Sequence, residues 1–213
     1  MAEGTGVEEA GAEGTDGGID RAMGQAAAAA RRPLAPRALG PDELADREAL
    51  RHLVTAYGHA IDRRDYALLR TLYHADAIDD HTPYYCGPAQ GYVDWLPEMM
   101  AHWRATMHTM LSQLFVIEGD HAEGEIAARA WHLTADGTRQ FVAWGRYADH
   151  YARRDGVWRF ARRAFILDFT EDLPAPAGSD FGSQGVATGR AGADDPIHAR
   201  LAGFARPDSA AAD

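Results

Sequence analysis

The sequence GRYADHYARRDGVWRFARRAFILDF, residues 145–169, contains one Asp-Gly step between two runs of strand-forming residues. Asp-Gly is a strong signal for a tight β-hairpin turn, because such turns need positive φ angles that glycine and aspartate accept. The flanking runs, about 139–153 and 157–169, are rich in aromatic and β-branched residues. The stretch therefore predicts two long antiparallel strands joined by a tight turn.

Two more strand-like segments come before this hairpin, at about 107–118 and 123–134. The sequence EGDHAEG separates them, and TADGTRQ, with a second Asp-Gly step, leads into the next strand. Strands connected by successive hairpins form an antiparallel meander. We therefore expect four sequential antiparallel strands in the second half of the chain.

Helical patterns occupy the first half of the chain, beginning at GPDELADREALRHLVTAYGHAIDRRD. Asp42 is placed to cap the first helix, although Ala45 stands where a capping-box glutamate would lie. We expect a second helix at about 66–74, a short strand at DAIDDH and a third helix at about 88–103. The first helix has an apolar stripe at a period of 3.6 residues, formed by Leu50, Leu53, Val54, Tyr57 and Ile61.

Helices followed by a run of strands predict an α+β domain over residues 41–172. Residues 1–40 are rich in Gly, Ala and Glu and are predicted to be disordered, because they offer little apolar surface to bury. Residues 173–213 are predicted to be mostly irregular. Within them, 194–204 is apolar enough to dock on the domain or on a neighbouring subunit.

Composition excludes several kinds of chemistry. The net charge of −11 argues against a nucleic-acid partner or an anionic membrane, both of which need a positive surface. The chain contains no lysine, so a Schiff base or a P-loop is impossible. The single Cys86 excludes an internal disulfide and a cysteine zinc site. Without a membrane-length apolar run or a convincing signal peptide, we expect a cytoplasmic protein.

Three stretches together resemble the SnoaL-like branch of the nuclear transport factor 2-like superfamily. They are LADREALRHLVTAYGHAIDRRDYALLRTLYHADA, TMHTMLSQLFVIEGDHAEGE and the hairpin quoted first. The resemblance covers about residues 42–170. It implies a cone-shaped fold, in which a curved antiparallel sheet wraps around the N-terminal helices and encloses one mostly apolar pocket. It also implies a homo-oligomer, a dimer or a trimer.

The family includes polyketide cyclases, scytalone dehydratase, bile-acid 7α-dehydratases, hexachlorocyclohexane dehydrochlorinase and non-catalytic binding domains. The fold therefore does not determine the function. In the dehydratase and dehydrochlorinase members, an aspartate at the end of the first helix holds a histidine on the first long strand. The resemblance implies that Asp62 and His108 occupy these positions.

An Asp-His pair is chemically coherent for proton transfer. A carboxylate that accepts from one imidazole nitrogen fixes the tautomer and raises the basicity of the other nitrogen. The alternative is that Asp62 is a solvated helix-end residue and His108 a core histidine bonded to backbone. Contact between the two side chains decides between these interpretations.

Two further residues are candidates for the catalytic set. The resemblance implies that Tyr57 acts as an acid or hydrogen-bond donor toward the leaving oxygen, where the dehydrochlorinase has a lysine. It also implies that Arg163 is the arginine of the pocket, although core packing of Tyr57 and a surface position of Arg163 remain alternatives. Strand alternation groups Arg163 with Phe165, Leu167 and Phe169.

We expect a substrate pocket without a metal or another cofactor. Asp79, Asp80 and His81 have the residue types of metal ligands, but no second histidine stands at a suitable spacing. The loop DDHTPYY is expected to border the mouth of the pocket. The expected pocket residues are His81, Tyr84, Tyr85, Trp95, Met99, Met110, Trp144 and Phe165.

The sequence thus favours a cofactor-independent lyase or isomerase acting on a small hydrophobic, cyclic, oxygenated substrate. His108 is the expected general base, oriented by Asp62. One alternative is a polyketide or natural-product cyclase that uses the same acid–base chemistry. The other is a non-catalytic ligand-binding or assembly module, such as the small subunit of a ring-hydroxylating dioxygenase.

Overall fold

The computed structural model describes residues 37–175 and 185–204. The fold lies in the unit that spans Leu39–Asp213. The predicted N-terminal extension falls almost entirely outside the described residues, as do parts of the predicted tail. The elements are, in chain order, α2 (Pro41–Asp62), α3 (Tyr66–Thr71), β1 (Tyr73–His81), β2 (Tyr85–Pro88), α4 (Ala89–Met100), β3 (Trp103–Glu118), β4 (His121–Thr134), β5 (Arg139–Arg154), β6 (Val157–Pro174), the 3-10 turn η2 (Gly192–Asp194), α5 (Pro196–Arg200) and the 3-10 turn η3 (Ala202–Phe204).

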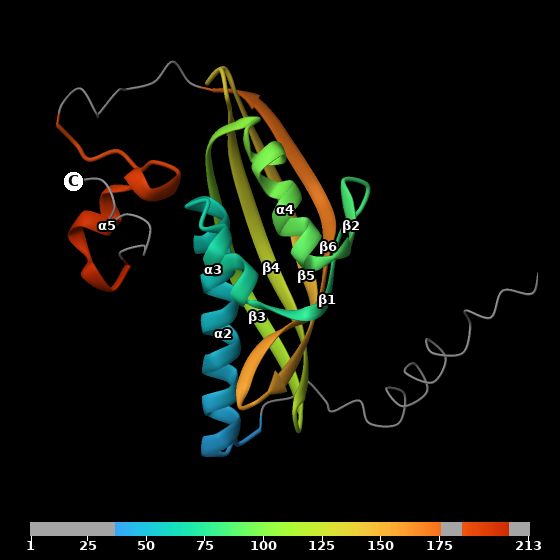
Figure 1. Ribbon diagram of the computed structural model, residues 1–213. Coiled ribbons are helices and arrows are strands. Elements are labelled where there is room, and N and C mark those ends of the chain that lie inside the picture. The colour runs from blue at the N-terminus through green and yellow to red at the C-terminus, as the bar shows by residue number, and fades with distance from the viewer. Residues whose placement is uncertain (1–36, 176–184, 205–213) are drawn as a thin grey trace, which may run out of the picture. The chain divides into compact units, whose positions relative to one another are not determined.

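The strands form one curved, unclosed sheet in the order β2-β1-β6-β5-β4-β3. Strands β3 to β6 are the predicted antiparallel meander, and β1 joins the far side of β6 in parallel. Helices α2 and α4 lie against the same face of this sheet (Figure 1). The α+β prediction is confirmed. No helix in the described ranges is long and apolar enough to span a membrane.

The turn between β5 and β6 has the predicted backbone. Asp155 and Gly156 both adopt positive φ, at 53° and 76°. This conformation matches the right-handed twist of the two strands that it connects. The strand β2 was not predicted, because its four residues YCGP contain a glycine and a proline, which are rare in strands.

Helix α2 carries the predicted apolar stripe on its buried side. Its start differs from the prediction, because Gly40 is the N-cap residue and Pro41 opens the first turn. Asp42 lies inside that first turn, where an acidic side chain interacts favourably with the helix dipole instead of capping it. The buried stripe consists of Leu50, Leu53, Val54, Tyr57 and Ile61.

Gly58 brings α2 unusually close to β3. A Cβ atom built on Gly58 would lie 3.3 Å from the carbonyl oxygen of His108 and 3.2 Å from Cε of Met110. Only a residue without a side chain lets the helix backbone approach the strand so closely. The C-terminal end of α2 is therefore held directly over the first half of β3.

Strand β3 contains a bulge between Met110 and Gln113, where three steps along β3 match two along β4. Before the bulge, Thr106, His108 and Met110 face the helices, opposite His132, Ala130 and Ala128. After the bulge, Phe115 and Ile117 face the same way and are buried in the core.

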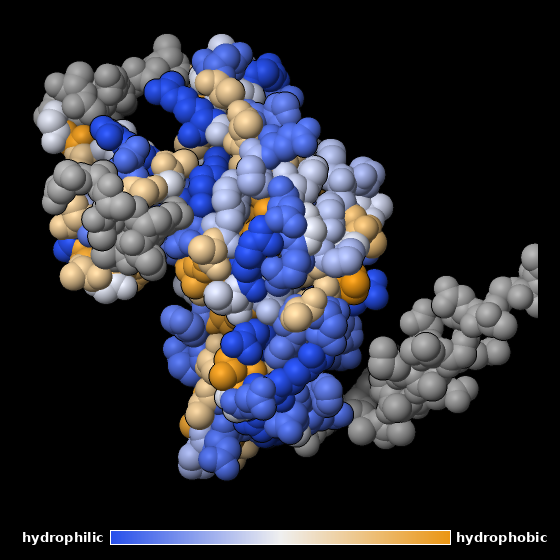
Figure 2. Space-filling model, in the orientation of Figure 1, coloured by the Kyte–Doolittle hydropathy of each residue, from blue (hydrophilic) through white to orange (hydrophobic). Residues whose placement is uncertain are grey.

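The face of the molecule that carries the helices is mainly hydrophilic, with separate hydrophobic spots (Figure 2). The opposite face of the sheet presents apolar side chains that are about half exposed. Strand alternation and the register place Met107, Leu111 and Leu114 of β3 and Ile166 and Phe169 of β6 on that outer face.

Candidate active site

Asp62 is the last residue of α2 and points at the first half of β3. Its Oδ1 lies 2.7 Å from Nδ1 of His108 and accepts a hydrogen bond of 2.9 Å from the Thr106 hydroxyl. Its Oδ2 accepts a hydrogen bond of 2.8 Å from the backbone N–H of His108. The two residues that the sequence analysis paired are therefore in contact, and the carboxylate is bound by one strand at three points.

Both side chains are largely buried, with 10% of His108 and 9% of Asp62 exposed. Burial alone would raise the pKa of the Asp62 carboxyl, but the hydrogen bonds from His108 and Thr106 outweigh it and lower that pKa below its usual value. Asp62 is therefore an anion at neutral pH and can only accept hydrogen bonds. It follows that Nδ1 of His108 donates the proton and that Nε2 is the free nitrogen.

His132 stands next to this pair and was not among the predicted site residues. Its ring contacts that of His108 edge-on, with centroids 5.5 Å apart at 83°. Burial, together with the neighbouring His108, lowers the pKa of His132 to about 4. Its buried Nδ1 has no hydrogen-bond partner in the described chain. His132 is thus a neutral imidazole beside the Asp62-His108 pair.

Aromatic rings and one arginine surround the two histidines. Trp103 and Phe141 both lie beside His132, with ring centroids 4.8 Å and 6.1 Å from it and 6.2 Å from each other. Arg64 donates to the Thr106 hydroxyl at 3.2 Å and so places a positive charge beside the Asp62 carboxylate. The site combines a charged, hydrogen-bonded end with an apolar wall.

Tyr57 lies in a different environment from the one expected. It is 1% exposed, and its hydroxyl shares a hydrogen bond of 3.2 Å with the hydroxyl of Tyr92. Burial raises the pKa of Tyr57 well above its usual value. In the described structure this hydroxyl makes no hydrogen bond with Asp62 or His108. Because Tyr57 is centred on the stripe that packs against the sheet, its phenol points into the core.

Arg163 is also placed differently from the expectation. It is fully buried, and its guanidinium donates two hydrogen bonds to Asp149, of 2.8 Å from Nε and 2.7 Å from Nη2. The rings of Tyr57, Tyr147 and Phe160 lie 4.0 to 4.1 Å from its central carbon. Its charge is therefore balanced by Asp149, while its buried Nη1 has no hydrogen-bond partner in the described chain.

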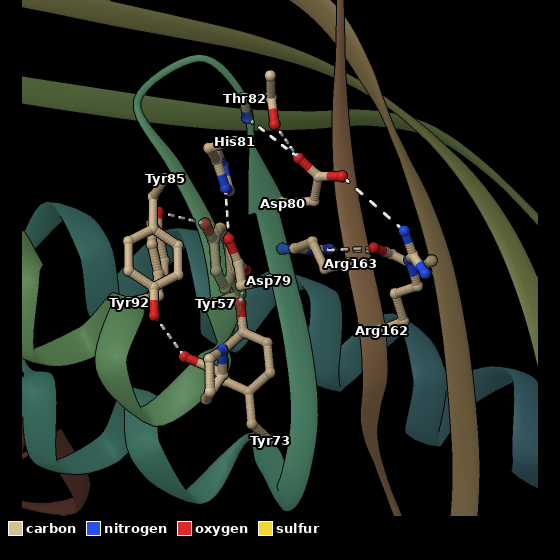
Figure 3. A network of polar contacts seen from close by, with 12 residues as sticks. Tyr57, Tyr73, Asp79, Asp80, His81, Thr82, Tyr85, Tyr92, Arg162 and Arg163 are labelled. Atoms are coloured by element: carbon tan, nitrogen blue, oxygen red, sulfur yellow. Dashed lines mark hydrogen bonds and ion pairs between the residues drawn. The ribbon is translucent and has the colours of Figure 1, made fainter. Parts of the chain in front are cut away.

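Four of the expected pocket residues form one aromatic group. His81, at the end of β1, stacks on Phe165 of β6 and on Tyr92 of α4. Tyr85 and Trp95 lie tilted against each other, with centroids 5.8 Å apart. Figure 3 shows the part of this group that surrounds His81, together with Asp79, Tyr73 and Arg163.

The remaining expected pocket residues are divided between the two faces of the sheet. Met110 faces the helices and packs against the core, and Met99 is half-buried in α4. Tyr84 is 71% exposed in the turn after β1, so it does not line the interior. Trp144 lies on the outer face, because its neighbour Ala143 is the residue aligned with Ala130 and His108.

The bulge in β6 also changes the predicted parity of the last strand. Phe169 pairs with Trp144, and their rings stack at 14° on the outer face. The prediction that Phe169 shares a face with Arg163 is therefore wrong, whereas Phe165 does share it, since it pairs with the buried Tyr147. A register shift between Trp144 and Gly145 accounts for the difference.

A cavity of about 350 Å³ lies away from the Asp62-His108 pair. The end of α2 and the C-terminal segment line it, and Arg63 donates to Asp195 across that contact at 3.1 Å. Within residues 37–175 and 185–204, no group of three or more His, Cys, Asp and Glu side chains is arranged to hold a metal ion. The lining residues of the cavity are His59, Arg63, Ala187, Gly189, Asp195, Pro196, Ile197, Arg200 and Phe204.

Comparison with protein families identifies the domain. The SnoaL-like domain matches residues 42–164, which is more than half of the chain. The chain belongs to the SnoaL-like family. The resemblance inferred from the three sequence stretches is thereby confirmed. No curated protein sequence matches this SnoaL-like chain significantly.

Solved structures similar to this SnoaL-like protein include a type 2 hexachlorocyclohexane dehydrochlorinase (LinA), with 21% identity and a TM-score of 0.59 over 62% of this chain and 91% of that chain. A proposed scytalone dehydratase from Novosphingobium aromaticivorans has 20% identity and a TM-score of 0.57 over 64% and 95%. A proposed aromatic ring hydroxylase from the same organism has 22% identity and a TM-score of 0.55 over 64% and 96%. At these identities the similarity establishes the fold alone.

Proposed function

We propose that this SnoaL-like protein is a cofactor-independent lyase of the dehydratase type, acting on a small hydrophobic, cyclic, oxygenated substrate. The contact between Asp62 and His108 carries the proposal. It leaves Nε2 of His108 as the nitrogen able to take a proton, and Asp62 stabilises the imidazolium that forms. His108 is the general base, and Asp62 is its positioning residue.

The hydrogen bonds of Asp62 support this role, because they fix the imidazole as well as its tautomer. The carboxylate binds both the ring and the backbone N–H of His108, so the side chain and the strand move together. Thr106 binds the same carboxylate and adds a further constraint. A base held in one orientation loses little entropy when the substrate arrives.

The neighbouring His132 supports proton transfer at His108 for an electrostatic reason. Because the pKa of His132 is lowered to about 4, it is neutral when His108 becomes charged, and it does not repel that charge. Its unpartnered Nδ1 is a polar group beside an apolar wall.

The apolar wall supports the substrate class. Trp103 and Phe141 lie 6.2 Å apart, nearly parallel, next to the two histidines. The stacked pair presents apolar surface beside His132, against which an apolar substrate ring can pack. A ring that carries a carbonyl group would have an acidified C–H next to that carbonyl, which an imidazole can remove without a metal.

The test uses cyclic β-hydroxy ketones, beginning with 3-hydroxycyclohexanone, whose loss of water gives a conjugated enone that absorbs ultraviolet light. The wild-type protein is expected to accelerate this loss. His108→Gln is expected to lower the rate by about 10² to 10⁴-fold, the usual contribution of a general base. His150→Gln, an exposed histidine on the outer face, is the matched control. Equal rates for His108→Gln and the wild type would contradict the proposal.

The alternatives differ in how they relate to the Asp62-His108 contact. A cyclase would use the same base, so only its substrate distinguishes it from a dehydratase. A non-catalytic module has no need for the contact, and would hold His108 through backbone groups. The observed hydrogen bond of 2.7 Å therefore favours the enzyme interpretation.

A further inference from the structure

A second aspartate-histidine pair lies at the end of β1. Nδ1 of His81 is 2.5 Å from Oδ1 of Asp79, and Oδ2 of Asp79 accepts a hydrogen bond of 2.7 Å from the Tyr73 hydroxyl. Asp79 is fully buried, and Figure 3 shows it between these two partners. The arrangement repeats that of Asp62 and His108, since the carboxylate engages Nδ1 and leaves Nε2 free.

The ring of His81 is held in place by aromatic side chains. The Tyr92 ring stacks on it at 4.9 Å and 7°, and the Phe165 ring at 5.8 Å and 11°. The Tyr147 ring contacts it edge-on at 6.0 Å. Rotation of the imidazole would break these contacts. Nε2 therefore keeps a fixed direction, as a positioned catalytic group must.

The free nitrogen of His81 is reachable. In the described part of the chain, Nε2 has no hydrogen-bond partner, and it is not among the buried atoms without one. The side chain keeps 18% of its surface exposed. A purely structural histidine in an aromatic core would be expected to use both nitrogens, because an unpaired polar atom is costly there.

Charge balance gives His81 a different role from His108. Arg163 is already paired with Asp149, so His81 is the one basic side chain within 4 Å of Asp79 among the described residues. A proton on His81 neutralises a fully buried carboxylate. Besides its histidine, Asp79 accepts one side-chain hydrogen bond, from the Tyr73 hydroxyl, whereas Asp62 accepts two, from the Thr106 hydroxyl and the backbone N–H of His108. The Asp79-His81 pair is therefore suited to hold a proton for donation.

Both pairs lie on the face of the sheet that the helices cover. His108 aligns with Ala130 and Ala143 across β4 and β5, and His81 contacts Tyr147 two positions beyond Gly145. The inner positions of β4 and β5 nearest His108 are small, namely Ala128, Ala130, Ala143 and Gly145, and the Phe165 ring that stacks on His81 lies over Gly145.

We propose that His81, held by Asp79, is the acid that protonates the leaving oxygen in the reaction that His108 begins. The inference rests on the proposed function. Nε2 of His108 takes a proton from carbon, the C–O bond breaks as the double bond forms, and the oxygen leaves with the electron pair. The proton on Nε2 of His81 completes the water molecule. His108 then returns its proton to solvent and His81 takes one up.

A pair of substrates that differ only in the leaving group separates acid from base. On 3-hydroxycyclohexanone, His81→Gln is expected to lower kcat by about 10² to 10⁴-fold, because hydroxide is a poor leaving group without a proton. On 3-acetoxycyclohexanone, which releases acetate and gives the same enone, the loss is expected to be less than about tenfold. His108→Gln should impair both substrates, and His150→Gln neither. Equal losses for His81→Gln on both substrates would overturn the inference while leaving the role of His108 intact.

A measurement on the wild-type protein covers the case in which His81→Gln fails to fold. In protein labelled with ¹⁵N-histidine, addition of 3-hydroxycyclohexanone is expected to shift the Nε2 resonances of both His81 and His108, and not that of His150. A shift at His108 without one at His81 overturns the inference. A shift at neither histidine contradicts the proposed function itself for this substrate class.

Discussion

Gly58 of α2 lies directly against the backbone of His108, so the distance between helix and strand depends on a missing side chain. The same contact region carries Asp62, one helical turn further on, whose carboxylate must reach Nδ1 of His108. Close packing at Gly58 and hydrogen bonding at Asp62 are therefore parts of one arrangement.

Substitution of Gly58 tests this coupling. Gly58→Val is expected to move α2 away from β3, because its Cβ would crowd the carbonyl oxygen of His108. The rate on 3-hydroxycyclohexanone should fall at least about tenfold, and the free energy of unfolding by about 1 to 3 kcal/mol. Thr55→Val, at an exposed position of the same helix, is the matched control. An unchanged rate in folded Gly58→Val would show that the close approach does not position the pair.

Removal of the Thr106 hydroxyl tests the support of Asp62. Thr106→Val keeps the shape of the side chain and a strand-forming residue but takes one donor from the carboxylate. The loss is expected to cost about 1 to 2 kcal/mol of stability and to raise the pKa of Asp62. Thr109→Val, on the opposite face of the same strand, should change neither quantity. Urea unfolding and carboxyl titration by NMR provide the two measurements.

The lowered pKa of His132 predicts a pH dependence of stability. A histidine with a folded pKa of about 4 and an unfolded pKa of about 6.5 binds more protons when unfolded, so stability rises with pH between these values. The native state should lose about 2 kcal/mol from this residue between pH 7 and pH 5. The pKa of His59 is also lowered, mainly by burial, and adds in the same direction. The lowered pKa of Asp62 affects stability only below the pKa of an unfolded aspartate, near 4, and so does not contribute between pH 7 and pH 5.

Urea unfolding of the wild type and His132→Phe at pH 7 and pH 5 isolates this contribution. The stability of His132→Phe is expected to depend on pH less steeply by about 2 kcal/mol over that range. Identical pH slopes in the two proteins would indicate that His132 titrates normally in the folded state.

Arg163 and Asp149 are expected to act on stability as a pair. Asp149→Leu leaves an uncompensated buried guanidinium and is expected to cost about 3 to 5 kcal/mol. The double variant Asp149→Leu with Arg163→Met removes both charges and should recover most of that loss. Thermal unfolding of the two variants checks this. A double variant no more stable than Asp149→Leu would indicate that the pair has a role beyond mutual neutralisation.

The elements that sequence analysis predicted are those decided by local physics. The turn at Asp155-Gly156 depends on positive φ, and the stripe from Leu50 to Ile61 on helical periodicity, and both are visible in short windows. Gly40 replaced Asp42 as the cap because Pro41 is favoured in the first turn. Strand β2 was missed because it depends on pairing with β1 rather than on its own residues.

Sequence analysis predicted the Asp62-His108 pair because family resemblance indicates which distant residues meet. It missed His132 and Asp149, whose positions depend on the register between neighbouring strands. His132 lies next to His108 because of the hairpin between β3 and β4, whose short turn could have aligned the two strands. The partner of Arg163 is Asp149, which stands opposite it across β5 and β6. Asp79 and His81 stand two apart in β1, a spacing that puts both on one face of a strand.

The bulge in β3 works as a shift of reading frame within a single strand. Upstream of it, even-numbered residues such as His108 face the interior, and downstream odd-numbered residues such as Phe115 do. The half of β3 that carries His108 and the half that packs into the core thus differ in which alternate residues face inward. The extra residue between Met110 and Gln113 produces this change. Deleting that residue would leave Phe115 and Ile117 facing the core and turn His108 to the outer face of the sheet. A change of one residue in strand length would thus remove the proton-transfer site and keep the hydrophobic core.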